Sequence, residues 1–292
     1  MARRAPAVER SIAVLNFLAA HPDDRYTLSE IARATDLNKA TLHAILGALT
    51  ESGFVLREEE KKTYGLGPAL VALGGAAVEA NPAVQLAVPQ MQGLSDDLGL
   101  DCVASTAIED QIVILTRTSS ARRPFGIDVQ PGQRLPLAPP LGTVFVAWSS
   151  DEEIDHWLAL VGPSASKADL TRYREAVETV RARGYSLGLG GEPVRAEESA
   201  AQRRRRRTLE ENVRTIRVDE YALIELDHSS AYRLNHIGAP VFGPNGRVTL
   251  AVFLIGFQGD IAAAEVPRYA ERLMEACSRV TKAIHGKPPA AA

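Results

Sequence analysis

The most regular pattern of hydrophobic and polar positions lies between residues 27 and 53, and it predicts two short helices. Thr27 and Glu30 have the T-x-x-E spacing of a capping box, in which the Thr hydroxyl accepts a backbone N–H and the carboxylate reaches back to the cap residue. Residues 36–38 interrupt the helical spacing with turn formers, and Asn38 can cap a second helix. That helix has one apolar face, formed by Leu42, Ile45, Leu46 and Leu49. This arrangement is typical of a helix-turn-helix.

The polar residues at the start of the second helix are the candidates for contact with DNA. A recognition helix presents its N-terminal part to base edges and phosphates in the major groove. The candidates on this helix are Asn38, Lys39, Thr41 and His43. We therefore expect double-stranded DNA to be a partner of this chain.

Segments on both sides of the motif complete a winged domain over residues 1–67. Residues 7–20 predict an amphipathic helix that packs on the motif, with an apolar face of Val8, Ile12, Leu15 and Leu18. Residues 54–67 have two short apolar runs around a charged tip, which predicts a β-hairpin, or wing. The tip is either a solvated turn or a phosphate contact. Since its three consecutive Glu would be repelled by DNA, any contact would come from Arg57, Lys61 or Lys62.

Residues 68–82 predict a linker helix that is apolar and rich in small residues. Its apolar face could pack against a second copy of the chain or against the chain's own second domain. Gly74 and Gly75 permit close approach of two helices, which favours a homodimer or homotetramer. Winged-helix proteins use such pairing to span two half-sites on DNA.

Residues 83–286 predict an α+β domain with an antiparallel sheet. Two pairs of apolar runs flank the turn signals at residues 109–110 and 243–246, and each pair predicts a β-hairpin. Helices are expected over residues 169–184 and from about residue 261 to 284, followed by a disordered tail at residues 287–292. A short strand and a loop precede Gly142, which opens a helical stretch. A loop that leads into a helix offers N–H groups that suit a carboxylate.

Residues 192–235 are the least interpretable part of the chain. They contain five consecutive arginines, Arg203 to Arg207, flanked by Glu residues in a sequence of high helix propensity. A charge run of this kind is more typical of a solvated helical face or a subunit contact than of a DNA contact. The segment could form a lid, extend the sheet or contact another subunit, and the sequence does not choose between these.

Length and composition agree with a globular protein of about two domains. The chain has 292 residues, of which 46% are hydrophobic and 24% charged. No stretch reaches the roughly 18 uninterrupted apolar residues of a membrane span, and the N-terminus lacks the apolar run of a signal peptide. We therefore expect a cytoplasmic protein with no membrane partner.

Net charge adds little support for a nucleic-acid partner. The chain carries 33 basic and 36 acidic residues, a net charge of −3, and residues 1–67 contain nine of each sign. The DNA-binding interpretation therefore depends on where the basic side chains are placed.

No metal site, cofactor site or catalytic site is indicated. Cys102 and Cys277 have no CxxC or His partner nearby and are expected to be core thiols. The motifs GxSxG and HExxH and the Walker loop are absent, and GLGLGG near residue 188 lacks a βαβ context. Asp227 and His228 are adjacent but have no Ser-based motif beside them. The sequence therefore does not predict an enzyme.

Taken in order, these segments resemble the IclR family of bacterial transcriptional regulators over about residues 6–286. The resemblance depends on AVERSIAVLNFL, on LSEIARATDLNKATLHAILGALTESGFV with YGLG after it, on GQRLPLAPPLG, on RGY, and on IGAPVFGPNGRVTLAVFLIG. It implies a winged helix-turn-helix, a linker helix used in dimerisation, and a GAF-like C-terminal domain that binds a small effector and changes operator affinity.

The chain departs from the family pattern at three places. Ala44 stands where members often have Arg on the recognition helix. Pro139 and Pro140 replace small polar residues and donate no N–H. Phe253 and Ile255 stand where some members with small-acid effectors have Ser.

The effector site that the resemblance implies comprises Leu141, Gly142, Thr143, His236, Phe253 and Ile255. Phe253 and Ile255 make it more apolar, which favours an apolar, aromatic or alicyclic effector, with His236 as one of few polar groups. The alternative is that these side chains fill the pocket, so that the C-terminal domain acts only in oligomerisation. In either case the resemblance implies a transcriptional regulator, expected to repress a catabolic or metabolic operon.

Overall fold

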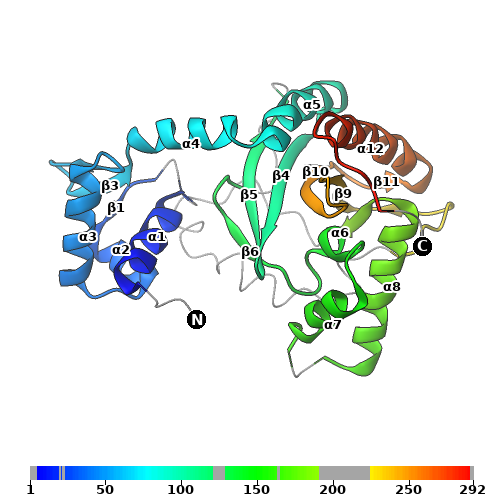
Figure 1. The fold of residues 1–292 in the computed structure, drawn as a ribbon, viewed down its shortest axis with the longest axis horizontal. Coiled ribbons are helices and arrows are strands. Elements are labelled where there is room, and N and C mark those ends of the chain that lie inside the picture. The colour runs from blue at the N-terminus through cyan, green and yellow to red at the C-terminus, as the bar shows by residue number, and fades with distance from the viewer. Residues whose placement is uncertain are drawn as a thin grey trace. The chain divides into compact units, whose positions relative to one another are not determined.

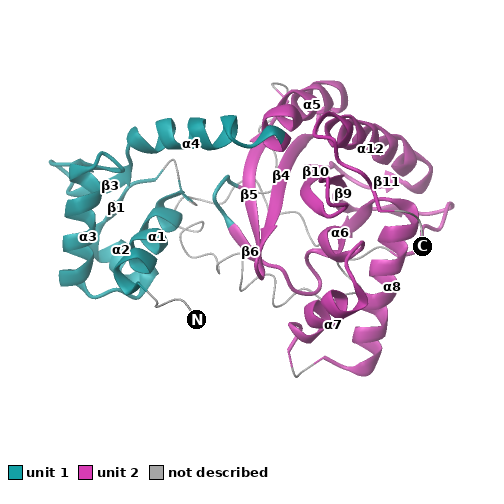
Figure 2. Cartoon of the chain, viewed as in Figure 1, with its two compact units in different colours: residues 1–82, 130–133 teal, residues 83–129, 134–292 magenta. Residues whose placement is uncertain are grey.

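The computed structural model describes residues 5–19, 21, 24–120, 129–162, 165–190 and 224–289. The chain divides into two compact units (Figure 2). The first comprises residues 1–82 and 130–133, and the second comprises residues 83–129 and 134–292. Each unit has a hydrophobic core of its own.

The first unit contains a three-helix core and a small antiparallel sheet (Figure 1). The core helices are α1 (Pro6–Ala19), α2 (Leu28–Thr35) and α3 (Lys39–Glu51). The sheet has the order β1-β3-β2, with β1 at Tyr26–Thr27, β2 at Val55–Glu58 and β3 at Thr63–Leu66. The helix-turn-helix and the wing hairpin predicted from the sequence are confirmed, whereas the short strand β1 was not predicted.

Side-chain caps define where α2 and α3 begin. The backbone N–H of Thr27 donates to the carboxylate of Glu30 at 2.8 Å, and the N–H of Glu30 donates to the Thr27 hydroxyl at 3.4 Å. Asn38 caps α3, since its Oδ1 accepts the N–H of Thr41 at 2.9 Å. Asp36 ends α2 in the left-handed conformation, with φ 53°. A side-chain cap stabilises a helix by about 1 kcal/mol. The first residues of α2 and α3 are therefore specified by the local sequence.

The predicted apolar face of α1 is only partly correct. Leu18 is 1% exposed and belongs to the core, but Val8 is 56% and Ile12 is 47% exposed. Val14, which was not assigned to that face, is 0% exposed. The described core contacts of α1 come from its C-terminal half, so the first turns have no apolar partner within this unit.

Helix α4 (Ala69–Glu79) follows the wing and has no buried residue. Its apolar side chains are open to solvent: Val71 is 77%, Leu73 is 54% and Val78 is 42% exposed. Apolar helices of this kind usually have a partner surface. Within the described ranges, no single helix has the length and apolarity of a membrane span. Helix α4 and the following helix α5 (Pro82–Leu98) pass that test only together, as a bent pair.

The second unit is built around a six-stranded antiparallel sheet with the order β6-β5-β4-β10-β9-β7. Two hairpins predicted from the sequence provide its four central strands, and they join where β4 pairs with β10. The α+β class with an antiparallel sheet is therefore confirmed. The strands are β4 (Asp101–Ile108), β5 (Gln111–Thr118), β6 (Arg134–Pro136), β7 (Ser186–Leu189), β9 (Leu234–Phe242) and β10 (Val248–Ile255).

One face of this sheet is covered by α5 (Pro82–Leu98) and α12 (Val266–Ala283), as Figure 1 shows. Their apolar side chains form the largest core cluster with alternate residues of β4, β9 and β10. Cys102 and Cys277 are both free and buried in this cluster, as predicted. Burial raises the pKa of Cys102 to about 11, so the thiol stays protonated.

On the opposite face, the sheet packs against α6 (Thr143–Val146). Two further helices pack onto α6, namely α7 (Asp151–Ala159) and α8 (Lys167–Arg183). The centre of this cluster is Trp157, which is 2% exposed. The predicted helix over residues 169–184 is confirmed, and Gly184 ends it at φ 86°.

The C-terminal helix begins later than predicted. Residues Ile261–Ala262 form a short strand, β11, paired with β8 (Ala231–Tyr232), and the 3-10 turn η1 (Ala263–Glu265) follows. Helix α12 starts only at Val266, with a proline in its first turn. Proline favours that position because it has no N–H to leave unpaired in the helix.

Some predicted features lie wholly or partly outside the described residues. The short strand expected before residue 129 falls largely on residues 121–128. The segment 192–235 is described only from residue 224, so the run Arg203 to Arg207 is outside. The predicted tail is described up to residue 289.

Candidate DNA-binding surface and effector site

The first half of α3 presents polar side chains to solvent. Lys39 and His43 are exposed, and Thr41 is half-buried. Within the described part of the chain, neither Lys39 nor His43 forms an ion pair. Asn38 uses its carbonyl oxygen as the cap, which leaves its amide N–H groups for another partner. Because Leu42 and the other apolar residues of α3 are fixed in the core, this polar face has a defined orientation.

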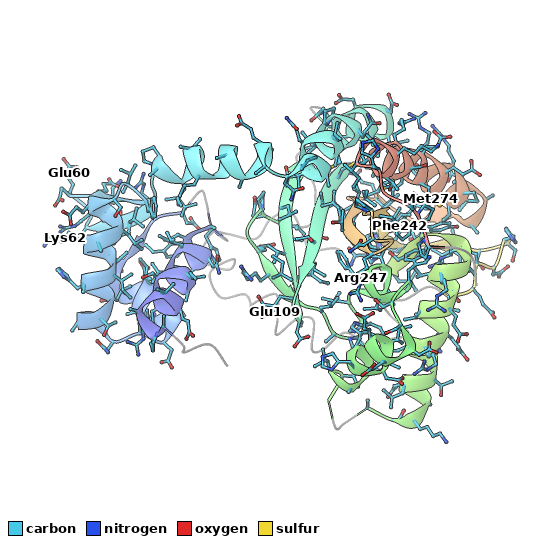
Figure 3. The ribbon with its side chains drawn as sticks, viewed as in Figure 1. Glu60, Lys62, Glu109, Phe242, Arg247 and Met274 are labelled. Carbon is cyan, nitrogen blue, oxygen red and sulfur yellow. The ribbon has the colours of Figure 1, made fainter. Side chains whose placement is uncertain are left out.

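Ion pairs neutralise most of the charge at the wing tip. Lys61 Nζ lies 3.1 Å from Glu58, and an Arg57 nitrogen lies 3.5 Å from Glu59. The hydrogen bond from Lys61 is the main cause that lowers the pKa of Glu58. Lys62 at the tip (Figure 3) is exposed, has φ 51°, and forms no ion pair with any described residue. Of the three predicted cations of the wing, Lys62 is therefore the one available to a phosphate.

His236, Phe253 and Ile255 lie on one face of the large sheet, opposite to the face that α5 and α12 cover. Ile255 pairs directly with His236, and Phe253 pairs with Gly238. Directly paired residues of antiparallel strands point to the same side. The His236 and Phe253 rings make an edge contact, with centroids 5.4 Å apart. The structure therefore brings together three of the residues that were predicted to bind an effector.

Two glycines make room for these aromatic rings. A Cβ atom on Gly188 would overlap the His236 ring, and one on Gly238 would lie 2.5 Å from Phe253 Cε1. Glycine inside a strand often marks such a close approach. These glycines are visible in the sequence, but the side chains that occupy the space beside them could not be predicted from it.

The predicted residues before α6 belong to this face only in part. Leu141 packs in one cluster with Ala251 and Phe253. Gly142, at φ 90°, instead faces Ile112 and Trp157, and Thr143 is buried. The helical stretch predicted from Gly142 is a single turn of 4 residues. A turn of that length has little macrodipole, so the expected carboxylate site at its N-terminus is not supported.

Comparison with known proteins places these features in context. The profile of the IclR helix-turn-helix domain matches residues 7–59. The Pca regulon regulatory protein of Pseudomonas putida is 24% identical over 166 residues, which cover 55% of this chain and 56% of that protein. The match thus spans just over half of that relative's length.

Two solved structures have the same fold along almost the whole chain. The crystal structure of an IclR transcriptional regulator from Alicyclobacillus acidocaldarius has a TM-score of 0.70 at 22% identity, covering 97% of this chain and 100% of the other. An IclR homolog from Microbacterium hydrocarbonoxydans, crystallised with 4-hydroxybenzoate, has a TM-score of 0.64 at 18% identity, covering 95% and 98%.

The chain therefore contains an IclR helix-turn-helix domain over residues 7–59, and it shares the fold of solved IclR regulators. The IclR profile extends over α1, α2, α3 and β2, so it includes every candidate DNA-contacting residue except Lys61 and Lys62. The matching relatives from Pseudomonas putida and Streptomyces griseus are both named as regulatory proteins.

The environment of His236 in the second unit favours the neutral form of its imidazole. Burial lowers the pKa of His236 to about 4, and the positive charge of Arg183 contributes to the decrease. Arg183 is itself shielded from water, donates from Nε to the Tyr185 carbonyl at 2.6 Å and lies over the Tyr185 ring. A neutral imidazole has one hydrogen-bond donor and one acceptor.

Two charged residues on the same face were missed by the sequence analysis. Arg117 pairs with Asp101 at 2.6 Å, and Asp101 is 5% exposed. Arg117 lies opposite Val103, whose side chain packs with Ile255. The sequence contained a signal for this pair. Asp101 begins the first strand of a predicted apolar hairpin, and Arg117 lies near the end of its second strand. The register that joins them depends on a bulge at Ala104/Ser105, which the sequence does not specify.

Proposed function

We propose that this chain is a DNA-binding transcriptional regulator of the IclR family that responds to a small-molecule effector and represses a catabolic or metabolic operon. The observation that carries the DNA-binding part is the capped α2–α3 pair, which fixes Lys39 and His43 on an exposed face while leucines hold the opposite face in the core. Such a regulator acts where the DNA is, in the cytoplasm.

We propose that two or more copies pair through α4. Its exposed Val71, Leu73 and Val78 provide an apolar surface, and Gly74 and Gly75 have open space where side chains would stand. One copy has Ala44 in the recognition helix and few unpaired cations on its wing, so it should bind DNA weakly. Pairing places two recognition helices on two half-sites and so provides specificity.

For the effector, we propose an apolar or aromatic molecule that carries a hydrogen-bonding group. Phe253 and Ile255 provide the apolar part of this sheet face, and the neutral His236 imidazole lies beside them as a polar group. The fold shared with a homolog that was crystallised with 4-hydroxybenzoate supports this class of ligand. If the effector binds one dimer arrangement more tightly, it changes operator affinity, with a coupling of about 1–3 kcal/mol.

Replacing Lys39 with Ala is expected to weaken binding to operator and random DNA alike, because a lysine on this face contacts phosphates. The slope of log K against log salt should decrease by about one unit. His43→Ala should instead change the preference between operators. Fluorescence anisotropy at several salt concentrations measures both effects.

The control for Lys39→Ala is Lys282→Ala, which removes the same charge from an exposed site on α12 in the second unit. It should leave the salt slope unchanged. If His43→Ala lowers affinity equally for operator and random DNA, His43 takes no part in base readout.

Isothermal titration with a panel of small organic acids and aromatic metabolites tests the effector part. We expect heat of binding and a raised melting temperature with at least one aromatic compound, and a loss of both in His236→Asn but not in His285→Asn, where the histidine is exposed. If no compound gives heat or a thermal shift, the remaining function is the alternative, a DNA-binding regulator whose filled C-terminal domain serves only oligomerisation.

A further inference from the structure

A cleft of about 670 Å³ lies in the second unit, between the ends of the two central hairpins and the helices α6 and α7. Residues from the β4–β5 turn, from the β9–β10 turn and from α7 line it. Figure 3 labels Glu109 and Arg247, one from each hairpin end. None of the predicted effector residues lines this cleft. Its volume is in the range of small-molecule sites, which is about 300–1,000 Å³.

The apolar lining of the cleft includes three aromatic side chains. Phe145, Trp148 and Trp157 contribute to it, and the chain has only 2 tryptophans. The indole N–H of Trp157 donates to the Leu141 carbonyl at 2.9 Å, so that ring has no donor left for a ligand. Trp148 is half-buried and rests edge-on against Phe242, with centroids 5.1 Å apart. Since Phe145 is 6% and Trp157 is 2% exposed, Trp148 is the ring that offers a π face to a ligand.

Acidic side chains dominate the rim. Two carboxylates already have a partner: Arg247 lies 2.7 Å from Glu153, and His156 Nε2 lies 3.5 Å from Asp110. Glu109 and Glu152 also line the cleft and form no ion pair with any described residue. The lining contains four carboxylates and one guanidinium, so the fixed charges around the cleft are mainly negative.

We propose that this cleft is a second ligand site, which binds a small organic cation with an apolar or aromatic body. The face of Trp148 attracts a cation through its π electrons, and the two unpaired carboxylates add Coulomb attraction. A bare metal ion is a poor fit, because the described residues contain no group of three or more His, Cys, Asp or Glu that could ligate one. The site is separate from the effector face, so it does not depend on the proposed effector.

A bound cation would also link elements that are distant in sequence. The ion pairs Glu153–Arg247 and His156–Asp110 already connect α7 with the two hairpin ends. An occupant between these elements would stabilise the folded second unit by mass action. Binding should therefore raise the melting temperature.

The probe for this site is benzyltrimethylammonium, with benzyl alcohol and phenylacetate as its neutral and anionic counterparts. Because both tryptophans of the chain line the cleft, tryptophan fluorescence of the full-length protein reports on occupancy directly. We expect a saturable fluorescence change with the cation, confirmed by isothermal titration, and affinity at least about tenfold weaker for the two counterparts.

The double variant Glu109→Asn/Glu152→Gln removes the two unpaired carboxylates. Glu109 has φ 51°, a left-handed conformation that Asn tolerates better than Glu, so the first substitution should not harm folding. We expect the affinity for the cation to fall about tenfold in the double variant. Glu271→Gln on α12, an exposed carboxylate outside the cleft, is the matched control and should bind as the unchanged protein does.

Three results would overturn the proposal: no saturable change with the cation at millimolar concentration, equal affinity for benzyl alcohol, or unchanged affinity in the double variant. A circular dichroism spectrum like that of the unchanged protein verifies that each variant is folded. Failure of this proposal can be distinguished from failure of the effector proposal, because His236→Asn should abolish effector binding but leave binding of the cation unchanged.

Discussion

Replacing Trp157 with Ala is expected to destabilise the second unit by about 3–5 kcal/mol, the usual cost of removing a large buried aromatic side chain. Trp157 is 2% exposed and packs edge-on against Tyr173, with centroids 6.1 Å apart. It joins α6, α7 and α8 in one cluster. Loss of the indole should therefore loosen the loop before α6, and with it Leu141 at the candidate effector face. Urea unfolding followed by far-UV circular dichroism measures the effect.

Trp157→Phe separates packing from hydrogen bonding. Phenylalanine keeps much of the apolar contact but cannot donate to the Leu141 carbonyl, which the indole reaches at 2.9 Å. We expect a loss of about 1–3 kcal/mol, the cost of leaving a buried acceptor unpaired. Trp148→Ala is the comparison, because Trp148 is only half-buried. If Trp148→Ala and Trp157→Ala cost the same, Trp157 is not the centre of this cluster.

The elements that sequence alone could predict are those specified by local interactions. The caps at Thr27 and Asn38, the wing hairpin and both long hairpins of the sheet follow from residues a few positions apart. Errors appeared where burial depends on distant partners. Val8 and Ile12 have the spacing of an apolar face but remain exposed, because periodicity identifies a face and not the surface that covers it.

The candidate sites were predictable to different degrees. The polar residues of α3 could be named, since caps and leucines fix the rotation of the helix. On the sheet, the resemblance to IclR regulators supplied His236 and Phe253, but Arg117 and Asp101 needed the actual register. The aromatic cleft was missed altogether, because it combines two hairpin ends with a helix from a third part of the chain.

Lowering the pH from 7 to 5 is expected to destabilise the second unit by about 2 kcal/mol through His236 alone. In the folded protein the pKa of His236 is lowered to about 4 from the ordinary value of 6.5, mainly by burial. Between these two values the unfolded chain binds a proton that the folded chain does not, so stability decreases as the pH falls. The slope approaches 1.36 kcal/mol per pH unit below pH 6.5 and levels off near pH 4.

Urea unfolding at several pH values, compared between the unchanged protein and His236→Asn, measures this contribution. Asparagine has no charged form, so the difference in free energy of unfolding between the two proteins should change by about 2 kcal/mol from pH 7 to pH 5. His285→Asn, which replaces an exposed histidine, should retain the full pH dependence. A constant difference between the unchanged protein and His236→Asn across this range would mean that the folded protein admits the proton, and that the effector face offers a charged rather than a neutral imidazole.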